Sequence, residues 1–88
     1  MPIRDVEIVN RLGMHARPAM QFVETAQRFR CNVTVHKDKM KVNGKSIMEM
    51  MMLAATRGTI LRVESQGADA DACLDALADL VKAGFHED

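Results

Sequence analysis

The sequence predicts an α+β fold, in which three helices cover one face of a four-stranded, mostly antiparallel sheet. Three observations support this. Segments with polar–apolar alternation and segments with a helical apolar period follow one another in the order βαββαβα. Each predicted helix carries a single apolar stripe. The 88 residues suffice for one hydrophobic core, so we expect a single domain over residues 1–88.

The first predicted helix begins directly after His15. Residues 6–9 alternate and predict a strand, and residues 10–14 break the alternation. Apolar residues then recur at spacings of three and four, which predicts a helix from about residue 16. Pro18 suits the first turn because proline lacks the N–H that a helix leaves unpaired there. The apolar stripe consists of Ala19, Phe22, Val23, Ala26 and Phe29.

A hairpin and a short second helix follow. Residues 32–36 and 40–42 both alternate, and the polar residues 37–39 between them predict a turn. Ser46 then opens a helix of about two turns, and the string from Ser46 to Glu49 has the S-x-x-E form of a capping box. In that motif the serine and glutamate side chains each accept a hydrogen bond from the other residue's backbone N–H.

The last third of the chain predicts a strand and a long amphipathic helix. Residues 59–65 form the strand, with Ile60 as its one apolar residue out of phase. The helix follows Gly67 and ends at Gly84. Its apolar stripe consists of Ala70, Cys73, Leu74, Leu77, Leu80 and Val81.

The composition excludes two classes of partner. Twelve basic and twelve acidic side chains cancel, so no overall field attracts nucleic acid or an anionic membrane. The chain has no Trp or Tyr and only three Phe residues, so it lacks an aromatic platform on which bases could stack. No apolar stretch approaches the length of a membrane span. We therefore expect binding to neither nucleic acid nor membrane.

The cysteines and the N-terminus predict a cytoplasmic protein. Cys31 and Cys73 are far apart and follow no C-x-x-C pattern, which favours two reduced core thiols over the alternative of one disulfide. The first five residues have no apolar run before a small-residue cleavage site, so they do not resemble a signal peptide.

His15 lies just before a predicted helix, in the string G-M-H-A-R-P-A of residues 13–19. The first turn of a helix offers unpaired backbone N–H groups and the positive end of the helix dipole, which together bind anions. The Arg17 guanidinium would contact an anion held there, and Gly13 lets the backbone turn tightly. The string therefore predicts an anion site beside an imidazole.

An imidazole in this position can accept a phosphoryl group, because one ring nitrogen is unprotonated near neutral pH. Zinc would need three or four ligands, and neither His36 nor His86 is spaced to join His15, so we expect no metal and no cofactor. A second catalytic group near His15 is also lacking, which argues against a hydrolase. The alternative interpretation of His15 is a polar residue beside the helix N-cap.

The string of residues 13–19 resembles the active-centre signature of HPr, the histidine-containing phosphocarrier of the bacterial phosphoenolpyruvate-dependent phosphotransferase system. The resemblance covers essentially the whole chain and implies an open-faced β-sandwich with sheet order 1-4-2-3. It implies phosphorylation of His15 on its δ nitrogen, with Arg17 steadying the phosphoryl group and Ala16 supplying a backbone amide. The implied donor is phospho-enzyme I and the implied acceptor an enzyme IIA domain. We therefore expect a monomeric carrier and no stand-alone enzyme.

Ser46 has two interpretations. It can simply cap its helix. The string of residues 44–48 also resembles the regulatory serine segment of HPr proteins that HPr kinase/phosphorylase controls, which implies phosphorylation of Ser46 and weaker binding of enzyme I. Glu49 departs from that pattern, because many regulated members have a small residue there and a carboxylate would repel phosphoserine.

Four methionines lie in the second predicted helix, which is too short to bury all of them. Methionine fills core gaps and also suits surfaces that must fit several partners, so we expect part of the set to be buried and the rest to form an apolar patch. The resemblance to HPr implies that Met20, Ile47, Met48 and Met51 border the histidine and contact partners.

The branch of the family stays open. The strings of residues 10–14 and 84–88 look similar to the nitrogen-related branch, whereas residues 44–48 look similar to the sugar-regulatory branch. The alternative to a sugar-transport phosphocarrier is a regulatory binding module of the nitrogen or catabolite-control type, whose phosphorylation state partner proteins sense.

Overall fold

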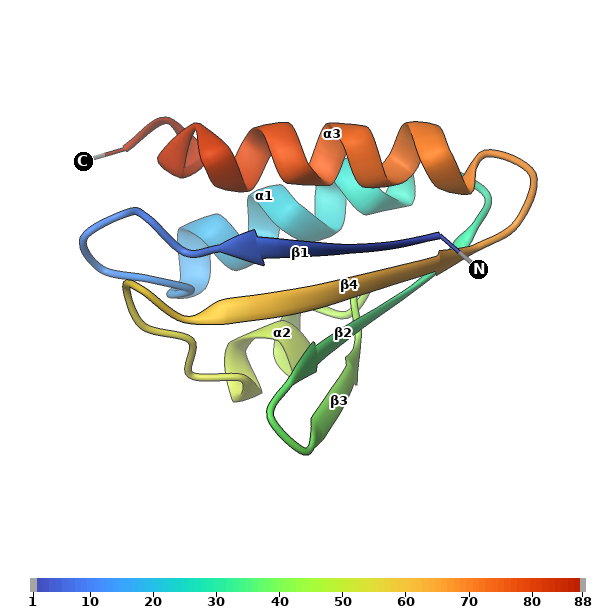
Figure 1. The fold of residues 1–88 in the computed structure, drawn as a ribbon. Helices are drawn as coiled ribbons and strands as arrows, with labels where there is room; N and C mark the ends of the chain where they lie inside the picture. Colours follow the sequence, from blue (N-terminus) through green and yellow to red (C-terminus); the bar gives the residue numbers. More distant parts are fainter. Residues whose placement is uncertain (1, 88) are drawn as a thin grey trace.

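Within the part of the chain that the structure describes, four strands and three α-helices follow one another in the predicted order (Figure 1). The computed structural model describes residues 2–87. The elements are β1 (Ile3–Glu7), α1 (Ala16–Gln27), β2 (Asn32–Lys37), β3 (Met40–Asn43), α2 (Ile47–Met52), β4 (Ile60–Gln66) and α3 (Ala70–Lys82), followed by a 3₁₀ turn, η1 (Gly84–His86).

The four strands form one antiparallel sheet in the order β1-β4-β2-β3, which confirms the order that the resemblance implied. Val6 of β1 lies opposite Leu61 of β4. Val35 of β2 lies opposite Val63 of β4 on one side and opposite Val42 of β3 on the other. All five side chains are buried, so the register places them together on one apolar face of the sheet.

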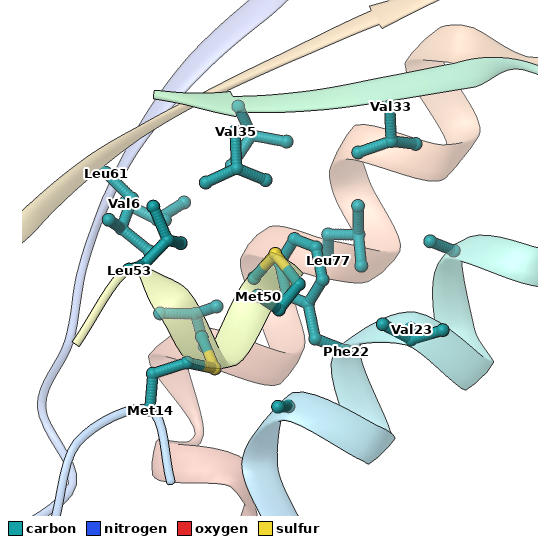
Figure 2. Packing of buried hydrophobic residues seen from close by; sticks show 14 of the residues in the cluster. Val6, Met14, Phe22, Val23, Val33, Val35, Met50, Leu53, Leu61 and Leu77 are labelled. Carbon is teal, nitrogen blue, oxygen red and sulfur yellow. The ribbon is translucent and has the colours of Figure 1, made fainter. Parts of the chain in front are cut away.

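The hydrophobic core lies between this face of the sheet and the helices. Figure 2 shows Val33 and Val35 of the sheet facing Phe22 of α1, Met50 of α2 and Leu77 of α3. Helices α1 and α3 pack side by side in Figure 1, and α1 also packs against α2. The predicted two-layer architecture, with helices on one face of the sheet, is therefore confirmed.

The predicted bounds of the first strand are wrong. The prediction placed it at residues 6–9, whereas β1 covers Ile3–Glu7. Ile8 extends the alternation because it is buried, but its N–H donates to Thr59 O outside the sheet ladder (2.9 Å). The earlier residues of β1 are exposed at the sheet edge, so no apolar period marks the true start of the strand.

Other bounds differ by a few residues. The first helix starts at Ala16 as predicted but ends at Gln27, so Phe29 lies beyond it and is only partly buried. The last strand runs to Gln66, one residue further than predicted. Ile60, the residue out of phase, points its side chain into solvent, as its phase indicates.

Both cysteines are buried free thiols. Burial raises the pKa of Cys73 to about 12, and its hydrogen bond with Cys31 adds to the effect. Within residues 2–87, no helix has the length and apolar character needed to cross a membrane.

Candidate functional site

His15 is the N-cap residue of α1. Its backbone is extended (φ −86°, ψ −171°) and its carbonyl oxygen accepts a hydrogen bond from Ala19 N (3.0 Å). The side chain makes no capping hydrogen bond, and 37% of it is exposed. His15 thus stands at the N-cap position of the alternative interpretation, but its imidazole does not cap the helix.

Two backbone amides in the first turn of α1, directly after His15, lack intrahelical partners. The N–H groups in the first turn of a helix have no intrahelical partner, and in α1 these belong to Ala16 and Arg17, because Pro18 has no N–H. Ala16 and Arg17 are exposed, whereas Pro18 is buried and anchors the turn. The start of α1 thus presents donors and positive charge to solvent next to His15.

The loop before His15 is clamped against a distant segment. Met14 N donates to Ala55 O (2.8 Å), and Gly13 has a left-handed backbone (φ +69°). A Cβ atom at Gly13 would lie 2.3 Å from Ala55 O, so no larger residue fits without moving the loop. Gly13 therefore fixes the backbone that precedes the histidine.

The C-terminal tail reaches the same site, which the sequence analysis missed. Glu87 Oε1 lies 2.9 Å from His15 Nε2, across a separation of 72 residues. The same oxygen accepts a hydrogen bond from Asn10 Nδ2 (2.8 Å), which also donates to Gly13 O (2.8 Å). The hydrogen bond from His15 and then that from Asn10 hold the pKa of Glu87 below its usual value, and the charge of Arg17 adds to this.

Ser46 occupies the N-cap of α2, as predicted, but the capping box is only half formed. Ser46 Oγ accepts a hydrogen bond from Glu49 N (3.2 Å). Glu49 Oε1 accepts from Asn43 N (3.0 Å) and not from Ser46 N, which donates to Asn43 O (3.1 Å). The expected reciprocal bond is therefore wrong, because the turn before α2 occupies the serine N–H.

The methionine set of α2 divides as expected. Met50 is fully buried in the core, whereas Met48 is 76% exposed. Ile47 and Met51 are also exposed, as is Met20 on the adjacent helix α1. We call the four residues Met20, Ile47, Met48 and Met51 the methionine surface.

The other histidines do not join His15. His36 Nε2 lies 3.1 Å from Glu64 Oε1 on the sheet. No group of three or more His, Cys, Asp or Glu side chains among residues 2–87 is arranged to hold a metal ion.

Similar proteins identify the family of the chain. A family model described as "PTS HPr component phosphorylation site" matches residues 3–83. The phosphocarrier protein HPr of Neisseria meningitidis serogroup A is 46% identical over 96% of this chain and 94% of its own length. The phosphocarrier protein NPr of Proteus mirabilis is 37% identical over 97% of this chain and 96% of its own.

Solved structures agree with the sequence matches. The crystal structure of HPr-C-His from Thermoanaerobacter tengcongensis superposes with a TM-score of 0.96 at 41% identity, covering 100% of this chain and 99% of that one. An HPr from Bacillus anthracis str. Ames superposes with a TM-score of 0.87 at 39% identity, over 91% and 95% of the two chains. The chain belongs to the HPr family, the phosphohistidine carriers of the phosphotransferase system, which take a phosphoryl group from enzyme I and pass it to enzyme IIA domains.

Proposed function

We propose that His15 is the residue that carries the phosphoryl group, and that the group is bound at Nδ1. The supporting observation is the geometry of this ring. It is partly exposed at the start of α1, and its Nε2 contacts Glu87 while its Nδ1 has no such partner among the described residues. A helix start also favours the dianion that forms on the ring.

Arg17 and Ala16 have separate roles in this proposal. The Arg17 guanidinium pairs with phosphoryl oxygens, for which its planar set of donors is suited. The backbone N–H of Ala16 donates to the same group. Both residues are exposed in the first turn of α1, where a docked partner can bring the phosphoryl group to them.

The test is a phosphotransfer assay with labelled phosphoenolpyruvate and enzyme I. We expect an acid-labile, alkali-stable label on the wild-type chain and none on His15→Ala. His36→Ala is the matched control, because His36 contacts Glu64 on the sheet and lies outside the proposed site. Label that persists in His15→Ala would refute the proposal.

The methionine surface is the proposed docking site for both enzyme I and the IIA domain. The side chains of this surface are exposed on two adjacent helices, and α1 begins directly after the histidine. Flexible, polarisable methionines suit a surface that must fit two partners in turn.

Ser46 is a proposed second control point, modified by an HPr kinase/phosphorylase. Ser46 is the N-cap residue of α2, next to Ile47 and Met48 of the methionine surface. A phosphate on Ser46 would therefore add negative charge where the donor is proposed to dock. The Glu49 carboxylate already accepts a hydrogen bond from Asn43 N, which uses part of its hydrogen-bonding capacity. Incubation with the kinase and ATP should give a mass shift in wild type and none in Ser46→Ala.

A second candidate function is a regulatory carrier of the nitrogen-related branch, whose phosphorylation state partners sense without sugar transport. It is supported by the string of residues 84–88 and by the relative named NPr. Competition between IIA domains of the sugar and nitrogen types for the phosphorylated chain distinguishes the two candidates, because the cognate domain should be phosphorylated faster.

The remaining proposals concern the state of the chain. We propose a cytoplasmic monomer that folds as one domain over residues 1–88, since a carrier with one docking face exchanges partners most simply as a monomer. Sedimentation or size-exclusion chromatography at several concentrations tests this, and a concentration-dependent dimer would refute it.

A further inference from the structure

We propose that Glu87 is a positioning residue that holds His15 in the tautomer with its proton on Nε2, leaving the Nδ1 lone pair available for phosphorus. This inference rests on the proposed role of His15 and adds a residue to it from the far end of the chain. It starts from the 2.9 Å contact between His15 Nε2 and Glu87 Oε1.

The direction of this hydrogen bond follows from its second partner. Glu87 Oε1 also accepts from Asn10 Nδ2 (2.8 Å), and an ionised carboxylate has acceptors only. The hydrogen shared with His15 must therefore reside on the ring nitrogen. A neutral imidazole has one N–H, so a ring that donates from Nε2 has a bare Nδ1.

Asn10 fixes the position of the carboxylate. Its side chain is buried, and its amide nitrogen donates both to Gly13 O and to Glu87 Oε1. Both partners are acceptors, so only the amide nitrogen can face them and the orientation of the amide is determined. One buried side chain thus ties the tail to the turn that precedes the histidine.

The backbone of residues 85 and 86 bends so that the Glu87 side chain reaches His15. Phe85 (φ +56°) and His86 (φ +59°) are both left-handed, a conformation that bulky L-residues rarely adopt. Phe85 is buried in the core and compensates for this strain by anchoring the turn, and Glu87 N donates to Gly84 O (3.1 Å). Figure 1 shows the C-terminus at the same end of the molecule as the loop between β1 and α1.

The carboxylate also suits the transfer step. The Nδ1 lone pair forms the N–P bond while the bond between phosphorus and its donor atom in phospho-enzyme I breaks, and that electron pair stays with the donor. The ring then carries a positive charge and keeps its proton on Nε2, where the Glu87 carboxylate stabilises it. When the group moves on, the N–P pair returns to Nδ1 and the ring is neutral again, so no proton has to leave Nε2.

The position of the Glu87 charge is also favourable for phosphoryl transfer. Glu87 contacts the nitrogen that does not take the phosphoryl group, and the two ring nitrogens point in different directions. The negative carboxylate therefore lies away from the incoming dianion, while Arg17 supplies positive charge at the helix start. The charge of Arg17 also contributes to lowering the pKa of Glu87.

The test compares the full-length wild type with Glu87→Leu, which has no acceptor for Nε2; a glutamine would still present its oxygen to Asn10 and to the ring. Glu24→Leu, at an exposed carboxylate of α1, is the matched control. Long-range ¹H–¹⁵N spectra of the His15 ring, recorded where the ring is neutral, should show Nε2–H in wild type and in Glu24→Leu and a mixture of tautomers in Glu87→Leu. The phosphotransfer rate from enzyme I should fall roughly threefold to tenfold in Glu87→Leu alone, as expected for loss of a partly exposed charge-assisted hydrogen bond.

The outcomes separate the two proposals. Unchanged ring spectra in Glu87→Leu, or a rate loss with no change in tautomer, would overturn the role of Glu87, while loss of label in His15→Ala would still support His15 as the acceptor. Equal effects in Glu24→Leu would also overturn it, since any surface carboxylate would then suffice. Retention of label in His15→Ala would instead refute the proposed acceptor.

Discussion

Ser46 Oγ accepts a hydrogen bond from Glu49 N, yet the Glu49 carboxylate accepts from Asn43 N and not from Ser46 N. The two side chains that form a capping box in sequence therefore stabilise two different parts of the chain. Ser46 caps α2, and Glu49 ties the first turn of α2 to the end of β3. Their contributions to stability should consequently be separable by mutation.

Replacing Ser46 with Ala should lower the free energy of unfolding by about 1 kcal/mol, because α2 loses its N-cap acceptor. Ser46→Asp should keep most of the stability, since aspartate caps as well as serine does. Urea unfolding of both variants measures the difference. Equal destabilisation by the two substitutions would contradict the assignment of Ser46 as a cap.

Met48 and Met50 are two residues apart but should respond differently to substitution. Met50→Ala should lower the free energy of unfolding by about 2–5 kcal/mol, because it opens a cavity in the core. Met48→Ala should change it by less than about 0.5 kcal/mol, because the side chain lies in solvent.

The exposed methionine is also the better probe of docking. Met48→Glu should leave the domain folded but slow phosphotransfer, since a charge would then lie on the methionine surface. Rates are to be measured with enzyme I and with a IIA domain, and Glu24→Gln controls for surface charge. Unchanged rates with both partners would contradict the docking role.

The features that local sequence predicts are those with local causes. The start of α1 after His15 follows from Pro18 and the apolar period, and the start of α2 follows from Ser46. The bounds of β1 were not predictable in this way, because an edge strand with exposed residues has no apolar period.

Glu87 and Asn10 were missed for a different reason. Glu87 contacts His15 across a separation of 72 residues. No apolar period or sequence motif indicates such a contact before the order of the strands is known. One usable signal was present: Phe85 follows Gly84 at the end of α3, and an apolar residue beyond a helix stop indicates a tail folded back onto the core.

The thiol of Cys73 should resist modification in the folded protein. Burial raises its pKa to about 12, so almost no thiolate exists near neutral pH. A thiol-reactive disulfide reagent at pH ~8, below the ordinary thiol pKa, should label the native chain only as fast as the protein opens, and should label both cysteines at once in urea. Rapid labelling of Cys73 without denaturant would contradict its burial.

Gly13→Ala should destabilise the protein more than Gly58→Ala. Both glycines have positive φ, so both substitutions carry a conformational cost of about 1 kcal/mol. A Cβ at Gly58 would meet no heavy atom within 4 Å, whereas one at Gly13 would lie 2.3 Å from Ala55 O. Thermal unfolding should show the excess, and similar losses in both variants would mean that the loop before His15 adapts freely.

The stabilisation that comes from the contact between Glu87 and His15 should be lost at acid pH. The folded-state pKa of Glu87 is lowered from 4.5, chiefly by the hydrogen bond from His15, so the stabilisation is fully present above pH 4.5 and is lost as pH falls through the lower folded pKa. The Glu87 side-chain carboxyl ¹³C shift, followed from neutral pH downwards, measures this midpoint directly. His15→Ala should raise the midpoint towards 4.5 and Asn10→Ala should raise it less, because His15 is the larger cause. An unchanged midpoint in His15→Ala would show that the tail does not bind the histidine in solution.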